Sequence, residues 1–129
     1  MDNVSDEDVD QFERACRLLE QGKNKEALLI FEALSDRYPD EVQFCAKVAV
    51  IYLDSEQYDL AEAPARAAVR LKPDSDLCSR LLFHTLLRPE RFEDAFEEMK
   101  RFILRGGVSP DYDAIIAEYG SIREENEEK

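Results

Sequence analysis

Residues 56–73, EQYDLAEAPARAAVRLKP, decide the fold, because a related pattern stands one interval before them and one interval after. The related stretches are GKNKEALLIFEALSDRYP at 22–39 and PERFEDAFEEMKRFILRGG at 89–107. Small and helix-terminating residues recur within them every 34 residues, namely Ala27, Ala61 and Ala95, then Pro39 and Pro73. Similarity at a fixed interval of this length is the signature of a chain built from stacked structural repeats.

The interval divides the chain into three units, at about 8–41, 42–75 and 76–108, and each unit indicates a pair of helices. Apolar residues such as Cys45 and Ala49 recur at helical spacing, and no stretch alternates with period two long enough to form a convincing strand. We therefore predict an all-α fold of one domain, with helices at about 5–21, 25–37, 41–53, 58–71, 76–87, 92–105 and 111–123.

Short polar side chains mark the expected helix starts. An oxygen at such a position accepts a hydrogen bond from a free N–H group of the first turn. We expect this capping role for Ser5, Asp40, Asp74 and Asp111.

The segment after the third unit is expected to close the stack. Gly106 and Gly107 end the sixth helix, and the helix at 111–123 covers the last pair, as the ends of repeat proteins require. The alternative is that 112–119 lies in the protein's own groove or against a neighbouring molecule. Residues 124–129 form an acidic tail that we expect to fray.

Composition excludes several classes of function. The chain has 129 residues and a net charge of −13, which disfavours binding to nucleic acid and to anionic lipid. Its longest strictly apolar run, 48–53, is too short for membrane insertion, and its acidic N-terminus is unlike a targeting segment. Three cysteines without a CxxC pair indicate reduced thiols and a cytoplasmic localisation.

A helix–turn–helix unit of 34 residues with a small residue in each helix and a terminal proline resembles the tetratricopeptide repeat (TPR), over about residues 8–108. The resemblance implies a right-handed superhelical stack of antiparallel helix pairs, with about seven helices in all. No tryptophan or tyrosine opens the first helices in the usual place, and Gly107 stands where the third repeat's proline would fall. Phe83 takes the place held by Ala15 and Ala49, so we expect looser packing in the third unit.

Catalysis has little support in the sequence. The chain has one histidine, His84, so paired metal-ligand spacings of the usual kind are missing. Cys78 is six residues from His84 and would lie on another side of the same helix, while Cys16 lies two repeats away. We predict that the protein is not an enzyme and needs no cofactor.

The resemblance to TPR proteins implies that the first helix of each pair lines a concave groove. Its predicted lining is mostly apolar, with a few polar groups to set orientation: Val9, Phe12, Cys16, Leu19, Gln43, Ala46, Lys47, Val50, Leu53, Leu77, Arg80, His84 and Leu87. Such a composition is typical of a groove that binds a peptide or a helix of a partner protein. The alternative is that the N-terminal segment or a homodimer partner covers this face, which would make the chain a structural or oligomerisation module.

One specialisation of the family is disfavoured. TPR co-chaperones of the Hsp70/Hsp90 type hold a terminal carboxylate with several basic and amide side chains, and only Lys47 is basic among the corresponding residues here: Phe12, Cys16, Lys47, Leu77 and Leu81. An apolar groove instead resembles TPR chaperones that shield hydrophobic segments, such as the class II chaperones of type III secretion. We therefore expect an adaptor or chaperone for a hydrophobic segment of another protein.

Overall fold

The computed structural model describes the backbone of residues 1–127 and the side chains of residues 1–118. Helices fill most of this range, and no strand occurs among the described residues, which confirms the all-α prediction. The helices are α1 (Asp6–Glu20), α2 (Asn24–Arg37), α3 (Val42–Asp54), α4 (Tyr58–Leu71), α5 (Asp76–Leu87), α6 (Phe92–Leu104) and α7 (Pro110–Glu127). Helix α7 continues to Glu127, the fraying expected from residue 124 stays a prediction, and residues 128–129 lie outside the described range.

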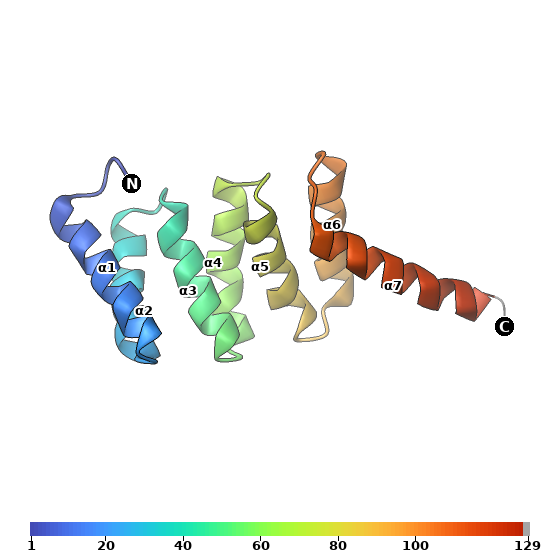
Figure 1. Cartoon of the computed structure of the whole chain (residues 1–129), viewed down its shortest axis with the longest axis horizontal. Helices are drawn as coiled ribbons and strands as arrows, with labels where there is room; N and C mark the ends of the chain where they lie inside the picture. The colour runs from blue at the N-terminus through green and yellow to red at the C-terminus, as the bar shows by residue number, and fades with distance from the viewer. Residues whose placement is uncertain (128–129) are drawn as a thin grey trace.

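The first six helices form a row of antiparallel pairs. Figure 1 shows α1, α3 and α5 along one side of the row and α2, α4 and α6 along the other. Each helix packs against the next one in the chain, and α3 also contacts α5 directly. Each pair therefore touches only its neighbours, as in a stack of repeats.

The 34-residue interval extends beyond the three predicted units. Helices α3, α5 and α7 begin at Val42, Asp76 and Pro110, which keeps the interval twice. Helix α7 thus takes the place of the first helix of a fourth unit. It leaves the row at the C-terminal end and points away from the other helices (Figure 1).

Small residues allow the paired helices to approach closely, as predicted. Ala27, Ala61 and Ala95 are completely buried, and so are Ala15 and Ala49 on the opposing helices. The looser packing expected around Phe83 is wrong.

The Phe83 ring is also completely buried, and it lies edge-on to Phe96 at 5.9 Å and to Tyr112 at 5.4 Å between ring centroids. An aromatic cluster that includes α7 therefore fills the space around it.

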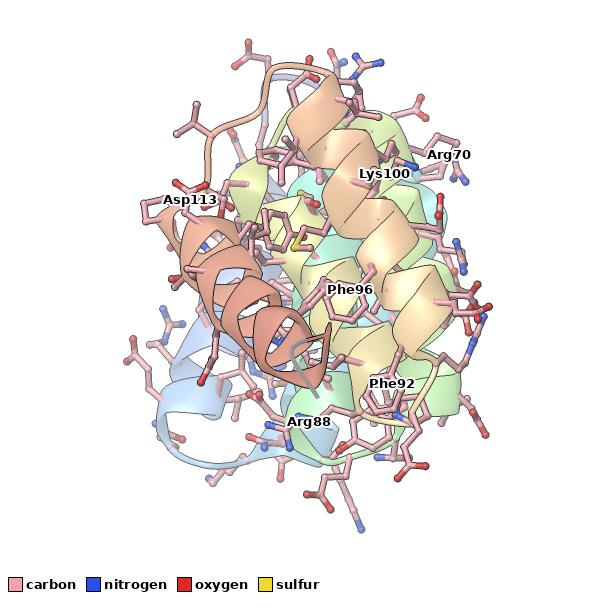
Figure 2. All side chains as sticks on the ribbon, turned by 90° about the vertical axis from the view of Figure 1, so that its right-hand side faces the viewer. Arg70, Arg88, Phe92, Phe96, Lys100 and Asp113 are labelled. Atoms are coloured by element: carbon pink, nitrogen blue, oxygen red, sulfur yellow. The ribbon has the colours of Figure 1, made fainter. Side chains whose placement is uncertain are left out.

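Helix α7 closes the end of the stack through its first turns. The Tyr112 side chain is completely buried, and its hydroxyl lies 2.7 Å from Ser79 Oγ on α5. Ser79 also donates to Glu98 Oε2 on α6 at 2.7 Å. The predicted covering role is thus confirmed for this part of α7, whereas the side chain of Tyr119 lies outside the described residues. Figure 2 looks along the stack from this end and shows Phe96 of α6 on the side toward α7.

Serine, and not aspartate, caps the helices that have a side-chain cap among those described. Ser5 Oγ accepts from the N–H of Asp8 at 3.2 Å, as predicted. The capping role expected for Asp40, Asp74 and Asp111 is wrong. Helix α3 begins after Glu41 and has no side-chain cap. Serines cap the other two helices, Ser75 before α5 and Ser109 before α7.

The prediction placed the caps of α5 and α7 one or two residues away from the serines that form them. Asp74 stands before the capping position and pairs with Arg105 instead, at 2.8 Å. Asp111 lies inside the first turn of α7, two residues after Ser109.

Candidate peptide-binding face

The predicted groove residues all lie on α1, α3 and α5, along one side of the stack, which we name the α1–α3–α5 face. None of them is completely buried. Gln43, Val50 and Leu77 are exposed, and the others are half-buried: Val9, Phe12, Cys16, Leu19, Ala46, Lys47, Leu53, Arg80, His84 and Leu87. The sequence register therefore selects side chains that solvent reaches, and the structure brings them to one side of the molecule.

The N-terminal part of this face contributes more to the core than predicted. The Phe12 ring lies edge-on to Phe31 at 5.7 Å and to Phe44 at 5.5 Å. Val9 packs against a cluster that includes the buried Val4 of the N-terminal segment. On α3 and α5 two apolar side chains of the face remain exposed, Val50 at 37% and Leu77 at 65%.

A hollow of about 350 Å³ opens between the end of α3 and the end of α5. Two predicted residues line it, Leu53 and His84. The remaining lining was missed by sequence reasoning and comes from the last residue of α3, the turn after it, the start of α4 and the residue that follows α5: Asp54, Glu56, Tyr58 and Arg88. The register considered only helix positions facing the groove, and it left out the turns that close the hollow.

The turn that borders the hollow has an unusual backbone. Glu56 has a φ of 60°, in the left-handed region that favours glycine. The residue one repeat earlier is Gly22, with a φ of 76°, and the residue one repeat later is Glu90, with a φ of 64°. The repeat therefore requires a left-handed residue at this place, and two of the three units supply glutamate. The 34-residue spacing of these positions is the sequence signal that marks Glu56.

Burial and two nearby arginines act together on His84. Burial lowers the pKa of the imidazole, and the nearby Arg80 and Arg88 lower it further, against an opposing effect of Asp111. The ring also lies edge-on to Phe83, at 5.3 Å between centroids. His84 is therefore a neutral side chain at pH 7, which can donate one hydrogen bond and accept another.

Arg80 is already engaged within the protein. Its Nε donates to Asp76 at 3.0 Å, and its Nη1 pairs with Asp111 of α7 at 2.8 Å. These contacts tie the start of α7 to α5. Arg80 is therefore less available to contact a ligand than the sequence suggested.

Other chemistry has little support among the described residues. The three cysteines are free, and burial raises the pKa of the Cys45 thiol, which keeps it protonated. No three histidine, cysteine, aspartate or glutamate side chains in the described part come together as a metal site. In the same part, no helix has the length and apolar character needed to cross a membrane.

Comparison with known proteins supports the fold through solved structures. No protein-family model matches the sequence, and neither does any curated protein. The first TPR domain of Spaghetti (RPAP3), bound to the HSP90 peptide SRMEEVD, gives a TM-score of 0.77 at 16% identity, over 92% of this chain and 94% of that one. The type III secretion chaperone SycD of Yersinia enterocolitica, in complex with a peptide of the translocator YopD, gives 0.75 at 17% identity, over 94% and 92%.

A third solved structure is similar over a smaller part of its length. The MamA RS-1 ArsTM double mutant gives a TM-score of 0.70 at 19% identity, over 78% of this chain and 56% of that one. At such identities the likeness shows the fold. The chain has a TPR-like fold, and the expectation drawn from the repeat motifs is confirmed at that level.

Proposed function

We propose that this protein is a non-catalytic adaptor or chaperone that binds an apolar peptide or helix of another protein on its α1–α3–α5 face. The accessible apolar surface at the centre of that face carries the proposal. Val50 is 37% exposed there, although it stands within the most apolar stretch of the chain. A partner that covers Val50 and Leu53 gains the free energy of removing apolar surface from water.

Two of the similar structures support the binding of a peptide. Spaghetti and SycD are each seen with a peptide, from HSP90 and from YopD respectively. The HSP90 peptide ends in EEVD, and the basic side chains expected for holding such an end are mostly missing here, because Leu77 and Leu81 occupy two of the corresponding positions. The proposal therefore takes an apolar segment as ligand rather than an acidic chain end. The free thiols fit a cytoplasmic site of action. The proposed binding involves no cofactor, no nucleic acid and no membrane insertion.

A pull-down with a matched control tests the proposal. The wild type is compared with Val50→Glu and with Leu60→Glu, which places the same charge on the exposed Leu60 of α4, on the other side of the stack. Circular dichroism first shows that both variants fold. A partner retained by wild type and Leu60→Glu and lost by Val50→Glu, with the loss reproduced by the purified partner, supports the proposal. Equal retention by both variants contradicts it.

Self-association is the second candidate, and a specific observation favours it. Leu104 and Val108 are 75% and 78% exposed near the C-terminal end of the stack, where no further pair covers them. A second copy that covered this region would make the chain a homodimer and a structural module. Light scattering at several protein concentrations distinguishes the two candidates. A molar mass that doubles as the protein is concentrated, and that returns to the monomer value in Leu104→Glu, favours self-association.

A further inference from the structure

The most exposed apolar side chains of the protein lie outside the α1–α3–α5 face. Leu104 and Val108 are more exposed than any other large apolar side chain among those described. Leu104 is the last residue of α6 and Val108 lies in the loop before α7, and we name this pair the C-terminal patch. The 34-residue register places charged residues at both positions in the earlier units: Arg70 and Asp74 in the second, Asp36 and Asp40 in the first.

The C-terminal patch is therefore a property of the third unit and not of the repeat. The interior does not require an apolar residue at either position, because the other units place a charge there. Two apolar side chains that stand together in water at such positions indicate a surface that contacts another protein molecule.

A hollow of about 360 Å³ lies between α1 and α2, which form the end of the row opposite to α6 and α7 (Figure 1). Leu29 lines this hollow and is 71% exposed, which ranks it directly after the C-terminal patch. We name the site the N-terminal hollow, and its apolar lining comes entirely from α2: Leu29, Ile30, Ala33 and Leu34. Exposed apolar side chains at one end of the row thus correspond to an apolar hollow at the other end.

Free basic side chains lie beside the C-terminal patch. Lys100 stands one helical turn before Leu104 on α6, is exposed, and makes no ion pair with a side chain that the structure describes. The same is true of Arg70 on α4, and Figure 2 shows Arg70 and Lys100 near the same end of α6, away from Phe92 at its start. Arg105 is less available, since it pairs with Asp74. This end of the row therefore has two free positive charges.

The N-terminal hollow has acidic surroundings. Glu7 lines it, is exposed, and has no ion-pair partner in the described part of the chain. Asp8 and Arg37 also line it, but they pair with each other. Residues 1–13 contain six acidic side chains and no basic one. The free charge at this end is consequently negative.

These charges favour contact between unlike ends over contact between like ends. Two copies joined through their C-terminal patches would bring Lys100 and Arg70 of one copy toward the same bases of the other, and like charges repel. Two copies joined through their N-terminal hollows would bring acids together. Contact between the patch of one copy and the hollow of the next places bases beside acids.

We propose that copies of this chain associate head to tail, with the C-terminal patch of one copy in the N-terminal hollow of the next. Covering Leu29, Leu104 and Val108 removes apolar surface from water and drives the contact. Because the two surfaces differ, each pair keeps one free patch and one free hollow, and further copies can add. The inference rests on self-association, the second candidate above, and leaves the α1–α3–α5 face open for a peptide.

Two variants, each blocked at one end, test the inference by light scattering over a range of protein concentrations. Leu104→Glu blocks the patch and Leu29→Glu blocks the hollow, and both changes replace exposed side chains. We expect the wild-type mass to rise past that of a dimer with concentration, and each variant by itself to stay monomeric. An equimolar mixture of the two variants should reach twice the monomer mass and stop there, because one intact patch meets one intact hollow.

A third variant controls for the added charge. Leu60→Glu makes the same change at an exposed leucine of α4 that belongs to neither the patch nor the hollow, and it should associate like the wild type. Circular dichroism first shows that all three variants fold. Loss of association in Leu60→Glu to the same extent would overturn the inference, since the effect would then come from net charge.

The remaining outcomes separate the inference from the proposals above. Dimers of Leu29→Glu by itself overturn the head-to-tail contact and leave self-association standing, as pairing of two C-terminal patches. A mixture of the two blocked variants that stays monomeric also overturns the inference. A wild type that is monomeric at every concentration overturns self-association as well. None of these results bears on the binding of a peptide, which the pull-down with Val50→Glu tests separately.

Discussion

The hydroxyl groups of Ser79 and Tyr112 lie 2.7 Å apart in the interior, and they join α7 to α5 across 33 residues of sequence. Both side chains are completely buried. Ser79 donates to Glu98, which also accepts from Arg101 on the same helix at 2.7 Å. The Tyr112 hydroxyl therefore donates to Ser79, and burial raises the pKa of Tyr112 to about 12.

Removing this hydrogen bond should loosen α7. Ser79→Ala leaves the buried Tyr112 hydroxyl without its partner and should lower the free energy of unfolding by about 1–3 kcal/mol. Tyr112→Phe removes the tyrosine hydroxyl itself, so that no hydroxyl is left buried without a partner, and it should cost only about 0.5–1.5 kcal/mol. Urea denaturation measures both, and Tyr58→Phe is the control, since its half-buried ring leaves the network untouched. A Tyr112→Phe variant less stable than Ser79→Ala would contradict this assignment of donor and acceptor.

Glycine at the left-handed turns should stabilise the fold. Glu56 and Glu90 have φ angles of 60° and 64°, which cost an L-residue about 1–2 kcal/mol. Glycine removes that cost, but its greater conformational entropy stabilises the unfolded chain by about 0.4–1 kcal/mol. Glu56→Gly and Glu90→Gly should therefore each raise the free energy of unfolding by about 0.5–1 kcal/mol. Thermal and urea unfolding measure the change.

The neighbouring turn positions provide the controls for this prediction. Gly22→Ala should destabilise the protein, because it introduces a side chain at a φ of 76°. Gln57→Gly should bring no gain, because Gln57 has a φ of −96° and holds no strain for glycine to relieve. Equal effects of glycine at positions 56 and 57 would show that the turns are unstrained.

The buried alanine of α4 at the repeat position predicts that a larger side chain is tolerated poorly there. Ala61 is completely buried on α4, in the place shared with Ala27 and Ala95. Ala61→Leu forces extra methylene groups into this contact and should cost about 1–3 kcal/mol. Ala63→Leu, on the exposed side of the same helix, should leave stability nearly unchanged. A silent Ala61→Leu, measured by urea denaturation, would mean that the repeat register is wrong.

Much of the fold could be predicted because its determinants are local. The bounds of α4 and α5 match the predicted ranges at both ends, since prolines and turn residues mark them in the sequence. The cap of α7 was placed at Asp111 instead of Ser109, because both side chains are good caps and only the backbone shows which one precedes the first turn.

The missed features depend on residues that meet only in three dimensions. Ser79 and Tyr112 stand in different repeats, and no local pattern indicates that their hydroxyl groups meet. The hollow beside His84 is completed by Glu56 and Arg88, which belong to a turn and to a helix end. The helical register that selected Val50 gives no information about such positions. Charge pairing was equally hidden, since Arg80 looked available in the sequence and is held by two aspartates.

The single histidine gives a direct test of the field on the α1–α3–α5 face. Burial and the charges of Arg80 and Arg88 lower the pKa of His84, so its NMR titration should have a midpoint below the ordinary value of 6.5. Folded protein therefore binds fewer protons than unfolded protein as the pH falls through 6.5. The contribution of His84 to the free energy of unfolding is complete above pH 6.5 and is lost as the pH falls through the lowered pKa. Arg88→Gln should raise the midpoint, whereas Arg70→Gln, on α4, should leave it unchanged. A midpoint at or above 6.5 in the wild type, or equal shifts in the two variants, would show that Arg88 does not set the potential at the face.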